Sequence, residues 1–208
     1  MPEPLRNCLK EPISAIFEAW ELLSSAVDAH VRADRAAAEV LFRQADMPEV
    51  WNWVNPGWVK PQLFVKVLKP DGDTLDLPAH QRKLPRNPAK AIRAAVLARD
   101  GYQCRYCGIP LVDADIRKLA HQLYPEAVPW DWRDPRQQHA GFQCFWLQYD
   151  HVIPNSHGGE SSEDNLVVCC ALCNYGKDKY TLRQLGLSDP RLRPPASNGW
   201  DGLERLRG

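Results

Sequence analysis

Two Cys-x-x-Cys pairs constrain the fold of this chain more than any other feature of its sequence. Cys104 and Cys107 form the first pair, and Cys170 and Cys173 form the second. Two intervening residues let both sulfurs of a pair approach one ion, and two pairs supply the four thiolates of a closed tetrahedral zinc site. We therefore predict that the fold brings these two distant segments together around one structural zinc ion.

The cysteine count also favours a metal site over a disulfide framework. Seven cysteines is an odd number, and paired cysteines in a reducing compartment favour metal binding. Cys170 is preferred to Cys169 as the ligand because it keeps the two-residue spacing to Cys173. Cys8, Cys144 and Cys169 are predicted to be small buried apolar side chains.

The chain is expected to be a soluble, cytoplasmic protein. Its composition, 44% hydrophobic and 25% charged, is ordinary for a globular protein. The sequence contains no uncharged apolar run of about 18 residues, so no membrane span is predicted. The N-terminal sequence MPEPLRNCLKEP lacks the basic start and apolar centre of a secretory signal.

The net charge of zero conceals an asymmetry between two parts of the chain. Residues 1–80 carry 8 Lys and Arg against 12 Asp and Glu, so residues 81–208 carry the compensating basic excess. The basic side chains cluster in one stretch: Arg82, Lys83, Arg86, Lys90, Arg93, Arg99 and Arg105. Such a stretch suits a phosphate backbone, because neutralising phosphates releases counterions. The alternative is the solvated face of a helix.

Residues 1–80 are predicted to form a mainly helical accessory region with a short hairpin. Apolar residues recur at helical spacing over residues 12–45, either as one long helix or as two helices broken near residues 32–34. Pro12 suits a first helical turn. The hairpin is predicted from a strand at Leu63–Leu68, a turn at residues 70–73 and a second strand at residues 74–77.

Three tryptophans, Trp51, Trp53 and Trp58, follow the helical segment among prolines and a glycine. They are either anchors for a protein partner, a stacking surface for bases, or caps on the core. Pro85 and Pro88 mark the predicted boundary with residues 81–208.

Beyond the boundary, the pattern predicts a helix over residues 89–99 and another over residues 113–124. Residues 125–140 are predicted to be irregular, and residues 142–149 to form a strand that carries Asp150. Asp150 and His151 pair a hard oxygen ligand with an imidazole whose ordinary pKa lies near neutrality. Asn165 then opens an apolar run that leads into Cys170.

These residues closely resemble the HNH endonuclease family. The resemblance is carried by RDGYQCRYCG, DHVIPNSHGG, NLVVCCALCN and the following Lys177, over about residues 86–185. It implies an α+β protein: a zinc-stabilised ββα-metal nuclease domain at residues 81–208, preceded by the helical region. A tryptophan-rich insertion at about residues 109–148 interrupts the match. A helix from Leu166 to about Leu185 is expected to lie behind the hairpin.

The resemblance implies a role for each matching residue. His151 would be the general base, its ring oriented by a backbone carbonyl, and Asn165 would brace the loop. Asp150 and Asn174 would hold a catalytic Mg²⁺ or Mn²⁺ ion. Asp178, four residues beyond Asn174 on a helix, is a candidate third ligand. Residues expected to bind nucleic acid are Lys177, Arg82, Lys83, Arg86, Lys90, Arg93 and Arg105.

The resulting hypothesis is a metal-dependent endonuclease that hydrolyses phosphodiester bonds in nucleic acid, with DNA as the expected substrate. The alternative is a zinc-stabilised module that binds nucleic acid or protein without cutting. The acidic charge of residues 1–80 and their tryptophans motivate a further hypothesis, that this region docks the nuclease onto a protein partner, for example in a bacterial defence system.

Overall fold

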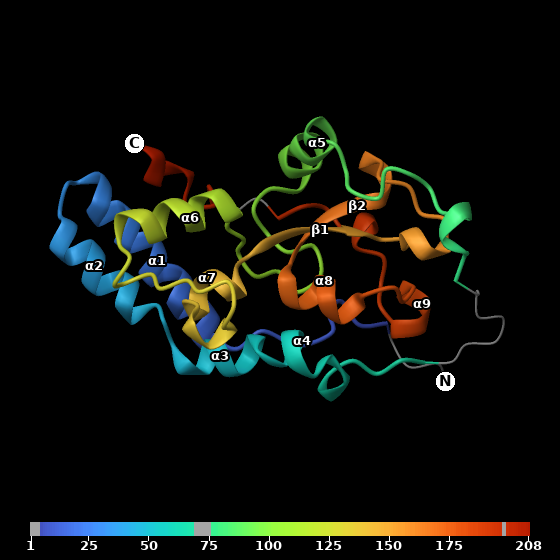
Figure 1. The fold of residues 1–208 in the computed structure, drawn as a ribbon, viewed down its shortest axis with the longest axis horizontal. Coiled ribbons are helices and arrows are strands. Elements are labelled where there is room, and N and C mark those ends of the chain that lie inside the picture. Colours follow the sequence, from blue (N-terminus) through green and yellow to red (C-terminus); the bar gives the residue numbers. More distant parts are fainter. Residues whose placement is uncertain (1–4, 69–75, 197–198) are drawn as a thin grey trace.

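Figure 1 shows a mixed α+β structure, in which helices surround a small two-stranded sheet. The computed structural model describes residues 5–68, 76–196 and 199–208. The N-terminal helices gather with α6 at one end of the molecule, and the sheet lies with α8 and α9 toward the other. The predicted fold class, with its helical N-terminal region and four-cysteine cluster, is confirmed.

The helical segment near the N-terminus consists of two helices, α1 (Ser14–Val31) and α2 (Arg35–Gln44). They separate where Ala33 adopts a left-handed backbone with φ of 61°. The side chain of Asp34 then caps α2 by accepting a hydrogen bond from the backbone N–H of Ala37. The two-helix alternative is therefore the correct one. Pro12 lies ahead of the α1 N-cap, Ile13, and not inside the first turn.

The tryptophan segment forms α3 (Pro48–Val54) and α4 (Pro56–Val59), and its aromatic rings pack inward. Trp53 is only 3% exposed, and its indole N–H donates to the carbonyl of Glu11. Trp58 stacks on Trp146 of the insertion, with ring centroids 5.7 Å apart. The rings of Trp53 and Trp58 therefore cap the core, which is one of the three interpretations that the sequence left open for this segment.

The predicted strand at Leu63–Leu68 is wrong. Pro61–Leu63 forms a 3-10 turn, η1, and residues 65–68 have no regular structure. The backbone N–H of Leu68 donates instead to the carbonyl of Gln184. The rest of the predicted hairpin falls largely on residues 69–75, outside the described residues.

Two predicted helices of the second region are present as α5 (Lys90–Asp100) and α6 (Ala114–Leu123). The side chain of Asp113 caps α6, and Gly101 ends α5 with a positive φ of 69° that favours glycine. The other 3-10 turns are η2 (Ala79–Gln81), η3 (Pro135–Gln137), η4 (Asn155–His157), η5 (Glu163–Asn165), η6 (Pro190–Leu192) and η7 (Glu204–Arg207).

The insertion packs on the N-terminal helices. Tyr124 follows α6 and contacts Phe42 of α2, with ring centroids 5.0 Å apart, and its hydroxyl lies 2.8 Å from Nδ1 of His30. Near its end the insertion forms α7 (Ala140–Cys144), and Nε2 of the N-cap residue His139 bonds to the carbonyl of Phe42. The strand predicted over residues 142–149 is therefore wrong at its start, because the strand begins only at Leu147.

The sheet consists of β1 (Leu147–His151) and β2 (Leu166–Cys170), which are antiparallel and place Asp150 opposite Val167. Every residue of β2 is buried. The helix predicted from Leu166 to Leu185 is wrong, because this short apolar run forms a buried strand. Helices α8 (Ala171–Lys177) and α9 (Leu182–Leu185) follow it.

Buried side chains from both predicted domains form one continuous core. Leu23 and Phe42 of the N-terminal region belong to the same cluster as Phe142 and Leu172. At Gly57 of α4, an added side chain would approach Leu172 of α8 to 3.3 Å. Helix α4 thus packs on α8, the helix that follows β2, and the division at residue 80 stays a prediction.

Candidate functional site

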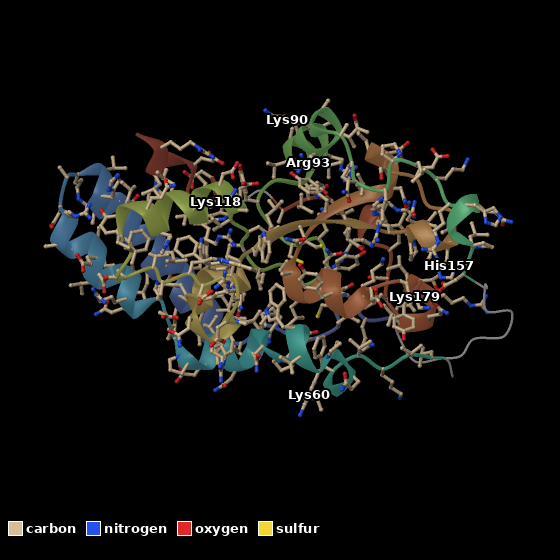
Figure 2. The ribbon with its side chains drawn as sticks, in the orientation of Figure 1. Lys60, Lys90, Arg93, Lys118, His157 and Lys179 are labelled. Atoms are coloured by element: carbon tan, nitrogen blue, oxygen red, sulfur yellow. The ribbon has the colours of Figure 1, made fainter. Side chains whose placement is uncertain are left out.

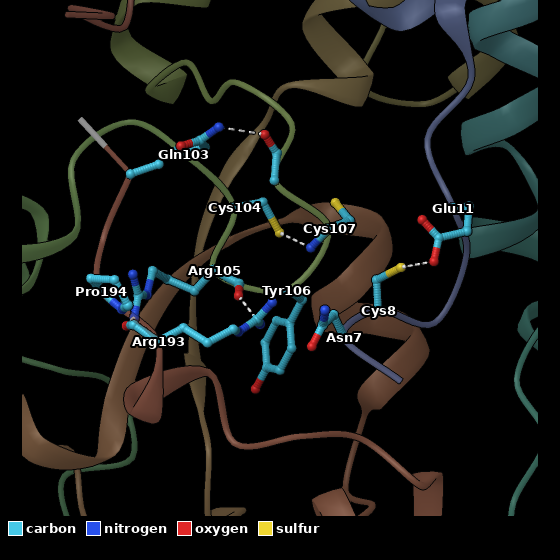
Figure 3. Close-up of a pocket in the computed structure, with 12 residues that line it drawn as sticks. Asn7, Cys8, Glu11, Gln103, Cys104, Arg105, Tyr106, Cys107, Arg193 and Pro194 are labelled. Atoms are coloured by element: carbon cyan, nitrogen blue, oxygen red, sulfur yellow. Dashed lines mark hydrogen bonds between the residues drawn. The ribbon is translucent and has the colours of Figure 1, made fainter. Parts of the chain in front are cut away.

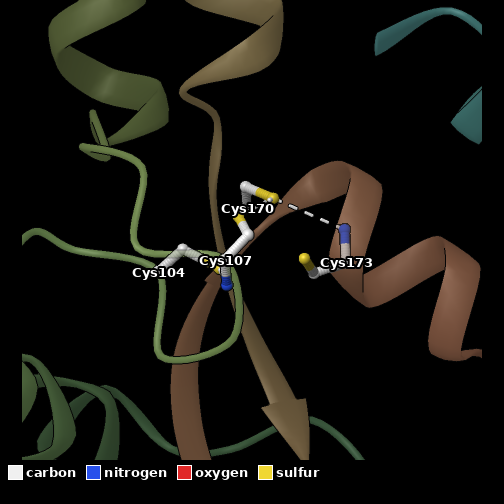
Figure 4. Close-up of side chains that lie close together, drawn as sticks. All are labelled: Cys104, Cys107, Cys170 and Cys173. Atoms are coloured by element: carbon white, nitrogen blue, oxygen red, sulfur yellow. Dashed lines mark hydrogen bonds between the residues drawn. The ribbon is translucent and has the colours of Figure 1, made fainter. Parts of the chain in front are cut away.

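The four cysteines of the two Cys-x-x-Cys pairs meet in one cluster (Figure 4), and their sulfur atoms all lie within 4.8 Å of one another. The first pair lies on a tight turn, in which the N–H of Gly108 donates to the carbonyl of Cys104. The second pair spans the end of β2 and the first turn of α8. The N–H of Arg105 donates to the carbonyl of Val168 at 3.0 Å, which attaches the turn to β2.

The donor set fits a zinc ion. Tetrahedral zinc with Zn–S bonds of about 2.3 Å requires sulfurs roughly 3.8 Å apart, and Cys107 and Cys170 have theirs at 3.7 Å. Three of the four cysteines are buried and Cys107 is partly buried, and burial raises the pKa of Cys170 to about 12. Four thiolates gathered here need a cation to compensate their charge. Cys169 lies outside the cluster, as predicted. Among the described residues this is the one such group of His, Cys, Asp or Glu side chains.

A separate cleft of about 420 Å³ opens beside the sheet. Asp150 and His151 line it at the end of β1, and Asn174 lines it from α8. Asp178, the residue that follows α8, lines it as well. The structure therefore brings together all four residues that the sequence assigned to the catalytic cation and the base. Arg82 and Arg86 line the same cleft from the segment that precedes α5.

Asp150 lies at the buried base of this cleft and is only 4% exposed. The hydroxyl of Tyr106 donates to its Oδ2 at 2.6 Å, and Lys177 Nζ donates to its Oδ1 at 3.1 Å. Burial raises the pKa of this carboxyl, while the Lys177 cation and the Tyr106 hydrogen bond lower it. Each carboxylate oxygen has two lone pairs, so both oxygens keep capacity for a cation.

His151 is oriented by a hydroxyl. Its Nε2 lies 2.9 Å from Ser161 Oγ, and this oxygen lies 2.9 Å and 2.8 Å from the carbonyls of Pro85 and Arg86. The Ser161 hydrogen must point to a carbonyl oxygen, since those oxygens would otherwise repel the hydroxyl. Ser161 Oγ therefore accepts the Nε2–H of His151, which leaves Nδ1 as the unprotonated ring nitrogen.

Burial lowers the pKa of His151, although the neighbouring Asp150 raises it. Burial therefore favours the neutral ring, the form that a proton acceptor needs. Sequence reasoning expected a backbone carbonyl on the ring and missed Ser161, which stands between the ring and two such carbonyls.

Asn165 ties together the two ends of the loop between β1 and β2. Its Oδ1 accepts from the N–H of Ile153, and its Nδ2 donates to the carbonyls of Ile153 and Glu160. Gly159 lies in the same loop, where an added Cβ would stand 1.8 Å from the carbonyl oxygen of Ile153. Only glycine fits this close approach.

Sequence comparison agrees with this geometry. Residues 142–188 match the HNH endonuclease family model. This HNH segment contains both strands, α8, α9 and the second cysteine pair, and it is therefore similar to a nuclease. Neither the comparison with curated proteins nor that with solved structures found a match. None of the helices formed by the described residues has both the length and the apolarity to cross a bilayer.

Two residues predicted to bind nucleic acid are not available to a phosphate. Lys177, within the HNH segment, is 1% exposed and bonds to Asp150 and to the carbonyl of His151. Arg105, outside it, is buried, and its guanidinium donates to the carbonyls of Pro190 and Arg193. Sequence alone treats a lysine or arginine as a surface residue, because the partners that permit burial lie far along the chain.

The other basic residues are accessible. Lys83 is exposed and pairs with Glu160 at 3.3 Å, beside the loop of the HNH segment. Lys90 and Arg93 are exposed on α5 (Figure 2). Together with Arg82 and Arg86 they form the basic flank of the cleft, a name kept below for these five residues.

Proposed function

We propose that this protein is a metal-dependent endonuclease that hydrolyses phosphodiester bonds in DNA and leaves 5′-phosphate and 3′-hydroxyl ends. One observation carries the proposal: a single cleft brings Asp150, Asn174 and Asp178 together with a histidine, His151, and two arginines, Arg82 and Arg86. Carboxylate and amide oxygens suit a divalent cation, the histidine suits proton transfer, and the arginines suit phosphate.

Asp150, Asn174 and Asp178 are the residues that would hold Mg²⁺ or Mn²⁺. Their donor atoms are hard oxygens, which these ions prefer. A bound divalent ion neutralises charge on the scissile phosphate and on the leaving 3′ oxygen. Asp150 is the least exposed of the three, and Asp178 is exposed at the rim.

His151 would take the proton from the attacking water at Nδ1. The hydrogen bond from Nε2–H to Ser161 holds the ring, so that Nδ1 is the nitrogen left to accept a proton. Asn165 acts on the same residue indirectly, because it fixes the loop that carries Ser161.

The basic flank would hold the DNA backbone. Arg82 and Arg86 lie in the cleft itself, and Lys83, Lys90 and Arg93 extend the positive surface along α5. Phosphate contacts position a duplex without reading its sequence. Binding through this surface should therefore weaken as salt rises.

The zinc ion held by the four cysteines would be structural, because four thiolates leave no open position for water. A protein partner for residues 1–80, for example in a bacterial defence system, is a hypothesis that the charge contrast supports. A cytoplasmic location stays an expectation from the sequence.

A cleavage assay with a metal panel tests the proposal. Supercoiled plasmid and matched single-stranded and RNA substrates would be incubated with the zinc-loaded protein and Mg²⁺, Mn²⁺ or Ca²⁺. We expect nicking of plasmid with Mg²⁺ or Mn²⁺, and its loss in Asp150→Asn protein that still binds DNA. His121→Ala, which alters a histidine on α6 outside the cleft, is the control. Plasmid binding without cleavage under every metal would favour the non-catalytic module.

A further inference from the structure

The turn that carries Cys104 and Cys107 is linked to Asp150, a residue of the cleft, through the side chain of Tyr106. Tyr106 lies between Cys104 and Cys107, is 3% exposed, and in Figure 3 its hydroxyl points away from the two sulfurs. That hydroxyl donates to Asp150 Oδ2 at 2.6 Å. The turn that binds one metal thus makes a direct hydrogen bond to the carboxylate assigned to the other.

The second oxygen of Asp150 is held from α8. Lys177 Nζ donates to Oδ1 and also to the carbonyl of His151, at 2.7 Å. Helix α8 begins with the Cys170 N-cap and carries Cys173 in its first turn. Both donors to Asp150 therefore belong to elements that the four-cysteine cluster fastens together.

We propose that Tyr106 is a positioning residue for the catalytic cation, and that through it the zinc site sets the orientation of Asp150. This inference rests on the proposed function. A ligating carboxylate needs its remaining hydrogen bonds to fix its direction, and loss of such a partner typically lowers metal affinity by about 10- to 100-fold. Tyr106 can fix the direction of the Asp150 carboxylate because its ring is buried in the core and the residue lies between Cys104 and Cys107 in the sequence.

The decisive variant is Tyr106→Phe, which removes the hydroxyl and keeps the ring. Mn²⁺ affinity would be measured by electron paramagnetic resonance on zinc-loaded protein, without DNA. We expect Mn²⁺ binding about 10- to 100-fold weaker than in the wild type, with one zinc per chain retained. Tyr102→Phe is a matched control, because the Tyr102 hydroxyl donates to the carboxylate of Glu204 at 2.9 Å, away from the cleft.

Asp150→Asn separates this inference from the proposed function. Asp150→Asn should weaken Mn²⁺ binding, and adding Tyr106→Phe to it should cause no further loss. Wild-type affinity in Tyr106→Phe, with weakened binding in Asp150→Asn, would overturn the role of Tyr106 and leave the nuclease proposal standing. Unchanged affinity in Asp150→Asn would overturn both.

A second measurement tests the inference without the Tyr106→Phe protein. Mn²⁺ should change the tyrosine absorbance of the protein in a Tyr149→Phe background, which removes the tyrosine that itself lines the cleft and leaves Tyr106 bonded to Asp150. The change should vanish when Asp150→Asn is added. A spectrum unaffected by Mn²⁺ would overturn the inference.

Discussion

Removing the Ser161 hydroxyl should slow cleavage without weakening DNA binding. Ser161 Oγ accepts from His151 Nε2–H at 2.9 Å, and its single hydrogen points toward the neighbouring carbonyls of Pro85 and Arg86. In Ser161→Ala the ring loses this partner, and its protonated nitrogen is no longer fixed at Nε2. Nδ1 would then be available in only part of the population.

The expected loss of rate follows from the net free energy of one neutral hydrogen bond. Such a bond contributes about 0.5–1.5 kcal/mol net, and about 1.4 kcal/mol corresponds to a tenfold change in rate. We expect kcat to fall roughly 2- to 12-fold, since the bond acts on a half-buried ring. KM for DNA should stay unchanged, because Ser161 does not belong to the basic flank.

Single-turnover cleavage of a duplex at saturating Mg²⁺ measures the loss of rate in Ser161→Ala. Ser161→Thr keeps a hydroxyl and should retain most of the rate. Ser162→Ala alters the next residue, which does not contact His151, and should behave like the wild type. If Ser161→Ala cleaved at the wild-type rate, or if Ser161→Thr were equally slow, the assigned orientation of His151 would be refuted.

Three further predictions concern stability, zinc and pH. Asn165→Ala loses three hydrogen bonds, so urea unfolding should show stability lower by about 1.5–4.5 kcal/mol; a loss too small to measure would contradict the bracing role. Cys170→Ser or zinc chelation should abolish cooperative thermal unfolding, because structural zinc contributes about 10–16 kcal/mol, more than most domains can lose; Cys8→Ser should unfold normally. Activity needs neutral His151, and burial lowers the pKa of this ring below its ordinary value of 6.5. We therefore expect kcat/KM to fall only as the pH drops through that lowered pKa. A fall in kcat/KM centred above pH 6.5 would be inconsistent with this environment.

The sequence predicted the parts of the site that depend on residue type and spacing. Two Cys-x-x-Cys pairs predicted a single four-thiolate site, and the structure brings all four sulfurs into one cluster. Asp150 and His151 were predicted to follow a strand, and they end β1. Asp178 was predicted to share a helix face with Asn174; both line the cleft, but the helical premise is wrong, because α8 ends at Lys177 and Asp178 follows it with a φ of 47°.

The remaining features depend on partners that local patterns do not reveal. Residues 166–170 form a strand because they pair with β1 and are buried on both faces, whereas the helix prediction extended α8 backwards across them. Tyr106 was missed because it acts on Asp150, 44 residues away in sequence. Ser161 was missed because its contact with His151 depends on how the loop between β1 and β2 folds back. Lys177 was assigned to phosphate because its burial against Asp150 depends on tertiary packing.

The rate of cleavage by His151→Ala tests the central claim most directly. The variant should be compared with the wild type in single-turnover hydrolysis of a DNA duplex with Mg²⁺, at equal zinc content and equal DNA affinity. General-base catalysis contributes about 10²- to 10⁴-fold, so we expect a loss of that order. Cleavage at the wild-type rate would contradict the assignment of His151 and of the cleft as the site of hydrolysis.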